Sequence, residues 1–340
     1  MIEKYYSGVI EQIYNRIGKE TRNIVMANYS NDFSIENLEV IRRYQSNEDN
    51  VFFAYSEFSY NTLVGAYEPF LDIICNMHRR FIGGSFDDFQ KECGVYYLHR
   101  QVLNSYYETG ECFREETVLL NEVAYEQRRM TMAIADMLKR LSEVRPLMIV
   151  INRFQMASKS SIETIKYLID NPCANIGIVL GVNAIVKGAD STVEVWDRIV
   201  ESLEDRSAIY YIGSAGPLKN NIKTTNDDEL YITMNFEQSI QEASNIMEFL
   251  DYEQARRGCR IIEHKIKFEN AWIDEKSLRR FYLVYARTSV LLGEMSKAIE
   301  LMNEYKALIP ENDSEHYFSL YYFMTVSYTH LRAHETTLHL

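Results

Sequence analysis

The segment RPLMIVINRFQMASKSSIETIKYLI, residues 145–169, carries the clearest fold signal in the sequence. Its apolar run from Leu147 to Asn152 is unbroken, which is typical of a strand buried on both faces of a parallel sheet. A helix is expected to follow, because Ser160 and Glu163 have the spacing of a capping box and apolar residues then recur at helical spacing. A strand that leads into a helix is the unit from which parallel α/β sheets are built.

The same alternation of apolar runs and amphipathic stretches extends through residues 1–235. Strands are predicted at residues 23–27, 51–58, 147–152, 175–182 and 208–213, and helices at residues 35–45, at residues 121–142 and from Ser160 onward. Strands that alternate with helices predict a three-layer α/β domain with a parallel sheet. Residues 236–325 show only helical periodicity, which predicts an all-α region. Its helices are expected at residues 236–250, 253–266, 275–292, 295–308 and 314–325.

The connection after the first strand is where a phosphate-binding loop of the pattern G-x-x-x-x-G-K-[ST] would lie. In that pattern the glycines let backbone N–H groups surround the phosphates, the lysine supplies charge and the last residue holds magnesium. Residues 27–34 read ANYSNDFS, so only Ser34 matches. Asp32 replaces the second glycine and Phe33 replaces the lysine. The sequence therefore predicts that the phosphate cradle has been lost.

The segment that follows the third strand is similar to the Walker B region of STAND-type and related AAA-like ATPases. There an apolar strand ends in an acidic pair that holds magnesium, whereas this chain has Asn152 and Arg153. Asn183, which ends the fourth strand, matches a position where that family often has a polar sensor residue. The resemblance spans about residues 20–215, including a Pro-Phe helix start at Pro69. It implies a three-layer sheet like that of the P-loop NTPases.

The same resemblance implies a degenerate nucleotide site with four matching positions, which are Ser34, Asn152, Arg153 and Asn183. Without the acidic pair the site is expected to have lost its metal ligands, so catalysis by this fragment is not predicted. An alternative is that Arg153 or a nearby lysine supplies the charge that phosphate needs.

Residues 278–310 resemble a tetratricopeptide repeat, in which small residues let two helices cross closely and a proline ends the second helix. The matching positions are Ala286, Gly293, Ala298 and Pro310. Tyr282 stands where a tryptophan is usual, and Ala255 is the equivalent alanine of a less regular preceding repeat. The resemblance implies a protein or peptide partner held by helical repeats. A generic antiparallel helix pair is the alternative.

Composition excludes several other classes of protein. Lys and Arg total 36 and Asp and Glu total 49, so the formal net charge is −13, which disfavours nucleic acid and anionic membranes as partners. No apolar run approaches the ~20 residues of a membrane span, and the N-terminus lacks the pattern of a signal peptide. The five cysteines are dispersed without a CxxC pair, and no metal or other cofactor is predicted. The cytoplasm is therefore the expected location.

The last 15 residues, 326–340, are predicted not to be native protein. The string VSYTHLRAHET resembles one reading frame of a transposase adapter that is used in DNA sequencing. His330 and His334 have the i, i+4 spacing of a metal-binding pair, and His339 lies nearby. We interpret these histidines as translated adapter, and we expect the native chain to be truncated near Thr325.

The segments YNRIGKETRNIVMANYS, residues 14–30, and CGVYYLHRQVLNSYY, residues 93–107, also resemble large clostridial signalling proteins that end in a diguanylate cyclase (GGDEF) domain. This resemblance implies a sensory and protein-interaction module that controls an output domain of the same full-length chain. No GG[DE]EF string occurs here, so the fragment itself cannot make cyclic di-GMP. The alternatives are a STAND-type regulatory ATPase that binds or weakly hydrolyses ATP, and a purely structural scaffold.

Overall fold

The computed structural model describes residues 2–30, 35, 38–46, 50–59, 63–114, 118, 122–183, 193–215, 235–268 and 272–309. The chain divides into two compact units. The first comprises Met1–Thr117 and Ala124–Leu230, and the second comprises Val118–Val123 and Tyr231–Leu340.

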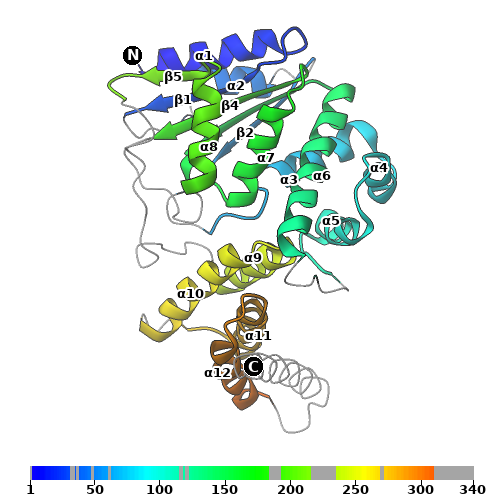
Figure 1. The fold of residues 1–340 in the computed structure, drawn as a ribbon, viewed down its shortest axis with the longest axis vertical. Helices are drawn as coiled ribbons and strands as arrows, with labels where there is room; N and C mark the ends of the chain where they lie inside the picture. Colours follow the sequence, from blue (N-terminus) through cyan, green and yellow to red (C-terminus); the bar gives the residue numbers. More distant parts are fainter. Residues whose placement is uncertain are drawn as a thin grey trace, which may run out of the picture. The chain divides into compact units, whose positions relative to one another are not determined.

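The first unit is built on a five-stranded sheet in which every paired strand is parallel to its neighbour (Figure 1). Its strands are β1 (Ile24–Tyr29), β2 (Phe52–Glu57), β3 (Leu147–Asn152), β4 (Ile176–Asn183) and β5 (Ile209–Ile212). The strand order is β2-β3-β4-β1-β5, which is like that of the P-loop NTPases. All five strands were predicted from apolar runs, and the α/β fold class is confirmed.

Helices cover both faces of this sheet and give the three layers. The helices of the first unit are α1 (Ile2–Arg16), α2 (Glu39–Ser46), α3 (Phe70–Met77), α4 (Phe86–Glu92), α5 (Tyr97–Thr109), α6 (Val123–Val144), α7 (Lys159–Asp170) and α8 (Val193–Glu204), with a π-helical turn at His78–Ile82 and a 3-10 turn, η2, at Phe154–Met156. Right-handed crossovers that run in opposite directions across a parallel sheet place their helices on opposite faces. Accordingly, α1 and α2 lie on one face, and α7 and α8 lie on the other (Figure 1).

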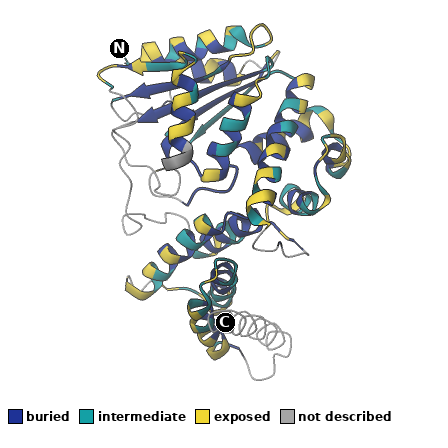
Figure 2. Ribbon diagram, viewed as in Figure 1, coloured by how far each residue is buried: buried dark blue, intermediate teal, exposed yellow. Residues whose placement is uncertain are grey.

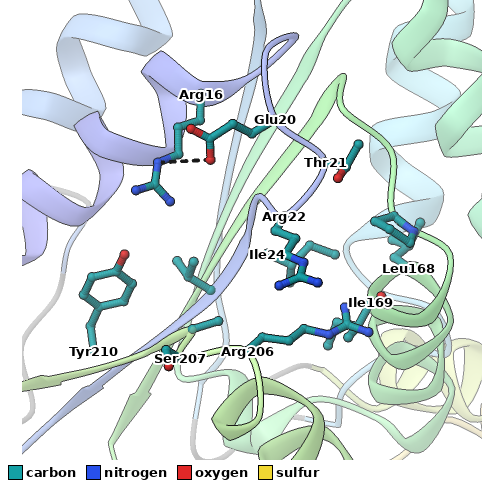
Figure 3. Close-up of a pocket in the computed structure, with 13 residues that line it drawn as sticks. Arg16, Glu20, Thr21, Arg22, Ile24, Leu168, Ile169, Arg206, Ser207 and Tyr210 are labelled. Carbon is teal, nitrogen blue, oxygen red and sulfur yellow. Dashed lines mark hydrogen bonds and ion pairs between the residues drawn. The ribbon is translucent and has the colours of Figure 1, made fainter.

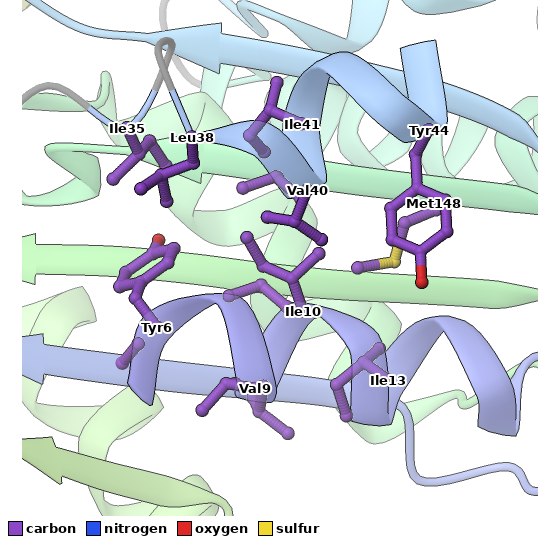
Figure 4. Packing of buried hydrophobic residues seen from close by; sticks show 14 of the residues in the cluster. Tyr6, Val9, Ile10, Ile13, Ile35, Leu38, Val40, Ile41, Tyr44 and Met148 are labelled. Atoms are coloured by element: carbon purple, nitrogen blue, oxygen red, sulfur yellow. The ribbon is translucent and has the colours of Figure 1, made fainter. Parts of the chain in front are cut away.

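The core beneath α1 and α2 is made by alternate strand residues and by one apolar stripe of each helix (Figure 4). Tyr6, Ile10 and Ile13 of α1 are fully buried there, as is Ile41 of α2. Every residue of β3 and β4 is buried, which is why these two strands read as continuous apolar runs (Figure 2). The unbroken apolar runs thus indicate that both strands lie in the interior of the sheet.

Two local predictions in the first unit need correction. The capping residue of α7 is Ser158 rather than Ser160, because Ser158 Oγ accepts a hydrogen bond from the Ser161 N–H at 3.4 Å. Ser160 lies inside the helix, where its Oγ instead accepts from the backbone N–H of Tyr67 at 3.0 Å. In addition, α2 begins at Glu39, four positions after the predicted start at residue 35. Helix α1 was not among the elements predicted from the sequence.

The second unit contains four helices in its described part: α9 (Phe236–Glu248), α10 (Tyr252–Phe268), α11 (Glu275–Leu291) and α12 (Met295–Ala307). All four match predicted helices. Ala286 and Ala298 are fully buried, as expected for small residues where α11 and α12 pack closely. Gly293 has φ of +77°, and the N–H groups of Gly293 and Glu294 donate back to Val290 and Ser289, which closes α11 with a Schellman motif.

Several sequence predictions lie outside the described residues. They concern Ser34, Pro310, the helix at residues 314–325 and the adapter-like residues 326–340. None of the helices in the described part of the chain combines the length and apolar character that a bilayer crossing requires.

Candidate functional site

The carboxyl ends of four strands meet at one edge of the sheet, and ligands of open α/β sheets bind at this edge. The last residues of β1 and β4, Tyr29 and Asn183, are register partners, and so are the last residues of β2 and β3, Glu57 and Asn152. We call this set of four residues the carboxyl edge. It brings together two of the sequence-predicted site residues, Asn152 and Asn183, and places the third, Arg153, directly after β3.

A buried hydrogen bond occupies the middle of the carboxyl edge. Tyr29 Oη donates to Asn152 Oδ1 at 2.6 Å, and both side chains are fully buried. Tyr6 of α1 packs its ring edge-on against Tyr29, with the centroids 6.2 Å apart. Gly181 of β4 makes room for this group, because a Cβ built there would lie 2.3 Å from Tyr6 Oη and 2.9 Å from Asn152 Oδ1. The missing side chain at Gly181 is therefore replaced by the phenol of Tyr6.

Burial also fixes the protonation state of this group. The pKa of Tyr6 is raised strongly, first by burial and then by its proximity to Tyr55 and Glu57. The phenol therefore stays neutral at physiological pH. A neutral phenol beside an amide provides hydrogen-bonding capacity without charge.

Arg153 is neutralised by a carboxylate of the neighbouring strand. Its Nη1 lies 2.7 Å from Glu57 Oε1, and the two side chains are 19% and 15% exposed. Tyr55 Oη donates to the other oxygen of the Glu57 carboxylate. Arg153 has a left-handed backbone, with φ of +54°, at the start of η2. The guanidinium that the sequence left open as a phosphate ligand is thus engaged within the protein.

Gln155 connects the ends of β3 and β4, a role that was not predicted from the sequence. The backbone N–H of Asn183 donates to Gln155 Oε1 at 3.3 Å, and Gln155 is 2% exposed. Glu57, Tyr6 and Tyr29 were missed as well. The one available signal was that Glu57 is an acidic residue at the end of an apolar run, since the tyrosines are too numerous to be singled out.

The chemistry that these residues can support is limited. Glu57 is the one charged residue of the carboxyl edge, and its carboxylate is paired with Arg153, which directly follows β3. Within the described residues no group of three or more His, Cys, Asp and Glu side chains lies close enough together to hold a metal ion. Magnesium-dependent phosphate chemistry needs carboxylate ligands and uncompensated positive charge. The described residues do not combine these features at this edge.

Burial keeps several of the remaining reactive side chains in their neutral forms. All five cysteines are free thiols, and burial raises the pKa of Cys75 to about 12 and that of Cys93 to about 11. Burial lowers the pKa of His99 to about 3, with the guanidinium groups of Arg114 and Arg129 acting in the same direction. The His99 imidazole is therefore neutral at pH 7, although its Nε2 lies 2.9 Å from Glu126 Oε2. These are the properties of packing residues rather than of nucleophiles or bases.

The second unit has a charged hollow of about 600 Å³ lined by α10, α11 and α12. Its walls are Arg260, Glu263, Tyr285, Gly293, Glu294, Met295, Ser296 and Lys297. Lys297 Nζ lies 2.9 Å from carboxylate oxygens of both Glu263 and Glu300 and 5.4 Å from the centroid of the Tyr285 ring. Burial raises the pKa of Tyr285 to about 12, and the Glu263 carboxylate contributes to the rise. The hollow therefore presents a neutral phenol beside charges of both signs.

No protein family model matches the chain, and no curated protein matches it.

Proposed function

We propose that this chain is a non-catalytic regulatory and protein-interaction module, built on a P-loop-NTPase-like sheet that no longer processes nucleotide. Two interactions within the protein support the proposal. At the edge of the sheet where a nucleotide would bind, Tyr29 is hydrogen-bonded to Asn152, and Arg153 is ion-paired with Glu57.

Binding of a nucleoside triphosphate at this edge would have to overcome both interactions. Freeing Arg153 would leave the Glu57 carboxylate facing phosphate oxygens, and like charges at short range repel. Reorienting Asn152 would remove the acceptor of the buried Tyr29 hydroxyl, and an unsatisfied buried polar group costs ~1–3 kcal/mol. The opposing argument for a STAND-type regulatory ATPase rests on the strand order, which is that of a nucleotide-binding fold.

The interaction role is proposed for the second unit. Its four helices pack in sequence order, and buried alanines lie at the positions where a tetratricopeptide-like hairpin has small residues. The hollow beside Lys297 offers charge of both signs and a tyrosine hydroxyl, which suits a peptide with its own charged side chains. We propose that a protein or peptide partner binds there.

The output of the module and its cellular location belong to the same proposal. We propose that partner binding is relayed to an output domain of the same full-length chain, such as a diguanylate cyclase, on the strength of the resemblance to clostridial signalling proteins. The free state of all five cysteines supports a cytoplasmic location. Re-sequencing the source locus through the codon for Thr325 tests the first point. A stop codon after residues 326–340 in genomic DNA would contradict it.

Thermal unfolding with and without Mg-ATP tests the loss of nucleotide binding. We expect no magnesium-dependent shift in Tm for the full chain, and none for Ser34→Ala. A magnesium-dependent stabilisation that Ser34→Ala removes would overturn the proposal in favour of the ATP-binding alternative. Release of phosphate in the same sample would identify a hydrolysing enzyme.

Affinity capture from source-cell extract tests the interaction role. The bait is the full chain, and the matched variant is Lys297→Glu, which reverses one charge in the hollow. We expect a partner that the wild type retains and the variant loses. Equal recovery by both would contradict binding at the hollow, and recovery of nothing would favour a purely structural scaffold.

A further inference from the structure

A second concave site lies on the first unit, at the edge of the sheet opposite to the carboxyl edge. It forms where the segment before β1, the end of α7 and the segment before β5 come together (Figure 3). The cavity has a volume of about 200 Å³. We call it the amino-edge pocket and define it by its lining residues, which include Arg16, Glu20, Arg22, Leu168, Arg206 and Tyr210. None of the sequence-predicted site residues lies in it.

Three arginines line this pocket, and they differ in how their charges are balanced. Arg16 forms an ion pair with Glu20 at 3.6 Å. Arg22 is exposed and forms no ion pair or hydrogen bond with the described residues. Arg206 donates from Nη1 to the backbone carbonyl of Ile169 at 2.5 Å, which orients the guanidinium but does not neutralise it. Among the described residues, Arg22 and Arg206 therefore contribute two positive charges without a carboxylate partner.

The arrangement of these two side chains favours an anion between or beside them. Figure 3 shows the guanidinium groups of Arg22 and Arg206 on the same side of the pocket, away from the Arg16–Glu20 pair. Two like charges in one cavity repel each other, and a bound anion would offset this repulsion. The whole chain carries a net charge of −13, so this local excess of positive charge is not a general property of its surface.

The rest of the lining is apolar or uncharged. Aliphatic walls come from Ile24, Val25, Leu168, Ile169, Pro172 and Ala208. Ser207 lies among them with φ of +52°, a left-handed backbone that is uncommon for a residue other than glycine. Strained residues of this kind are concentrated at ligand sites. The pocket thus combines the two positive charges of Arg22 and Arg206 with an apolar wall.

We infer that the amino-edge pocket binds a small phosphate monoester, with Arg22 and Arg206 as its phosphate ligands. A phosphate dianion matches two uncompensated guanidinium groups in charge, and the planar donors of arginine match its oxygens in geometry. The volume of about 200 Å³ is below the ~300 Å³ at which most small-molecule pockets begin, so a small ligand is expected. Binding of such a ligand would let a small molecule control the proposed regulatory module. The ligand would bind at the amino edge, opposite to the edge where P-loop NTPases bind nucleotide.

Isothermal titration of the full chain at constant ionic strength tests this inference. The probes are phenyl phosphate and inorganic phosphate, and the variants are Arg22→Gln and Arg206→Gln. Arg128→Gln is the matched control, because Arg128 is an exposed arginine of α6 that does not line the pocket. We expect saturable binding by the wild type and the control, and at least tenfold weaker binding by each pocket variant.

The two probes separate the possible sources of the ligand. Tighter binding of phenyl phosphate means that the apolar wall contributes to binding and supports an organic phosphate as the ligand. Equal binding of the two probes would show that only the phosphate group is recognised and would overturn the assignment of a monoester. No saturable binding of either probe would overturn the inference, and so would an equal loss of affinity in Arg22→Gln and Arg128→Gln. If Arg206→Gln fails to fold, the exposed Arg22 still decides the outcome.

Discussion

The two edges of the same parallel sheet differ in how they treat charge. At the carboxyl edge, Arg153 is ion-paired with Glu57, and Tyr29 is hydrogen-bonded to Asn152. At the amino edge, Arg22 and Arg206 line an open pocket without a carboxylate partner among the described residues. In P-loop NTPases the phosphate-binding chemistry belongs to the carboxyl edge. The common direction of the parallel strands fixes where the two edges are, and a few side chains decide which edge can bind an anion.

The largest expected loss of stability comes from a glycine-to-alanine substitution in β4, and the strand offers one such site near each edge of the sheet. Gly181→Ala should lower the free energy of unfolding by about 3 kcal/mol, because the new methyl group overlaps the buried Tyr6 hydroxyl and the Asn152 amide. Gly177→Ala lies toward the amino edge, where the new methyl group would lie 2.8 Å from Ile17 Cδ1 and 3.0 Å from Cγ2 of the buried Ile13. The Ile17 side chain can move, so a smaller loss of about 1–2 kcal/mol is expected.

Urea unfolding measures this difference. Trp196 is buried in the first unit, and a Trp272→Phe background removes the exposed second tryptophan, so fluorescence reports the first unit alone. A loss of about 1 kcal/mol or less for Gly181→Ala would show that the carboxyl edge is not tightly filled.

The next effect concerns the ion pair that neutralises the carboxyl edge. Glu57→Gln should cost about 2 kcal/mol, since it deprives a mostly buried guanidinium of this carboxylate. The control is Arg43→Gln, which breaks a pair between α1 and α2 whose side chains are 55% and 44% exposed, so roughly 0.5 kcal/mol is expected. The same fluorescence assay applies. A cost for Glu57→Gln no greater than that of the control would mean that Arg153 is free to bind an anion.

A third prediction uses the raised pKa of Tyr6. The folded state holds the Tyr6 proton above the pKa of 10.0 that applies when the chain is unfolded, so its contribution is complete below pH 10 and is lost as pH rises. One such group lowers the free energy of unfolding by about 1.4 kcal/mol at pH 11 relative to pH 8.

Tyr6→Phe should therefore lose less stability than the wild type across this pH range. Tyr5→Phe is the control, because the Tyr5 side chain is 63% exposed, and it should follow the wild type. Superimposable pH profiles for Tyr6→Phe and the wild type would show that the phenol is open to solvent.

The smallest expected losses of stability come from removing one tyrosine hydroxyl at each edge of the sheet. Tyr29→Phe removes the buried donor to Asn152 and should cost about 1 kcal/mol. Tyr210→Phe removes an exposed hydroxyl that lies 3.3 Å from Gln12 Oε1. The expected loss in the free energy of unfolding is roughly 0.3 kcal/mol. A cost for Tyr210→Phe as large as that for Tyr29→Phe would reverse the ranking of the two edges.

The strands were predictable because each is a buried apolar run, and the helices of the second unit were predictable from periodicity. Helix α1 was missed although its apolar residues have helical spacing, because its tyrosines and charged residues mask the stripe that Ile10 and Ile13 form. The capping residue of α7 was misassigned because Ser158, Ser160 and Ser161 lie together, and only the contact with Tyr67 shows that Ser160 is used elsewhere.

The candidate sites were less predictable than the fold. Asn152, Arg153 and Asn183 were identified from the resemblance to the Walker B and sensor positions of STAND-type and AAA-like ATPases. The partners that engage them, such as Tyr29, Glu57 and Gln155, were not predicted. Arg22 precedes β1 and Arg206 precedes β5, so the two residues line one pocket only because these strands pair. No local sequence pattern could therefore predict the amino-edge pocket. Long-range pairing, rather than composition, brings these side chains together.

Isothermal titration with ATP, with and without magnesium, tests most directly whether the carboxyl edge has lost its nucleotide chemistry. The samples are the wild type, Ser34→Ala and Arg22→Gln. The account predicts that no binding depends on magnesium, and that any binding of the ATP phosphates is weakened by Arg22→Gln and unchanged by Ser34→Ala. Magnesium-dependent binding that persists in Arg22→Gln and disappears in Ser34→Ala would contradict it.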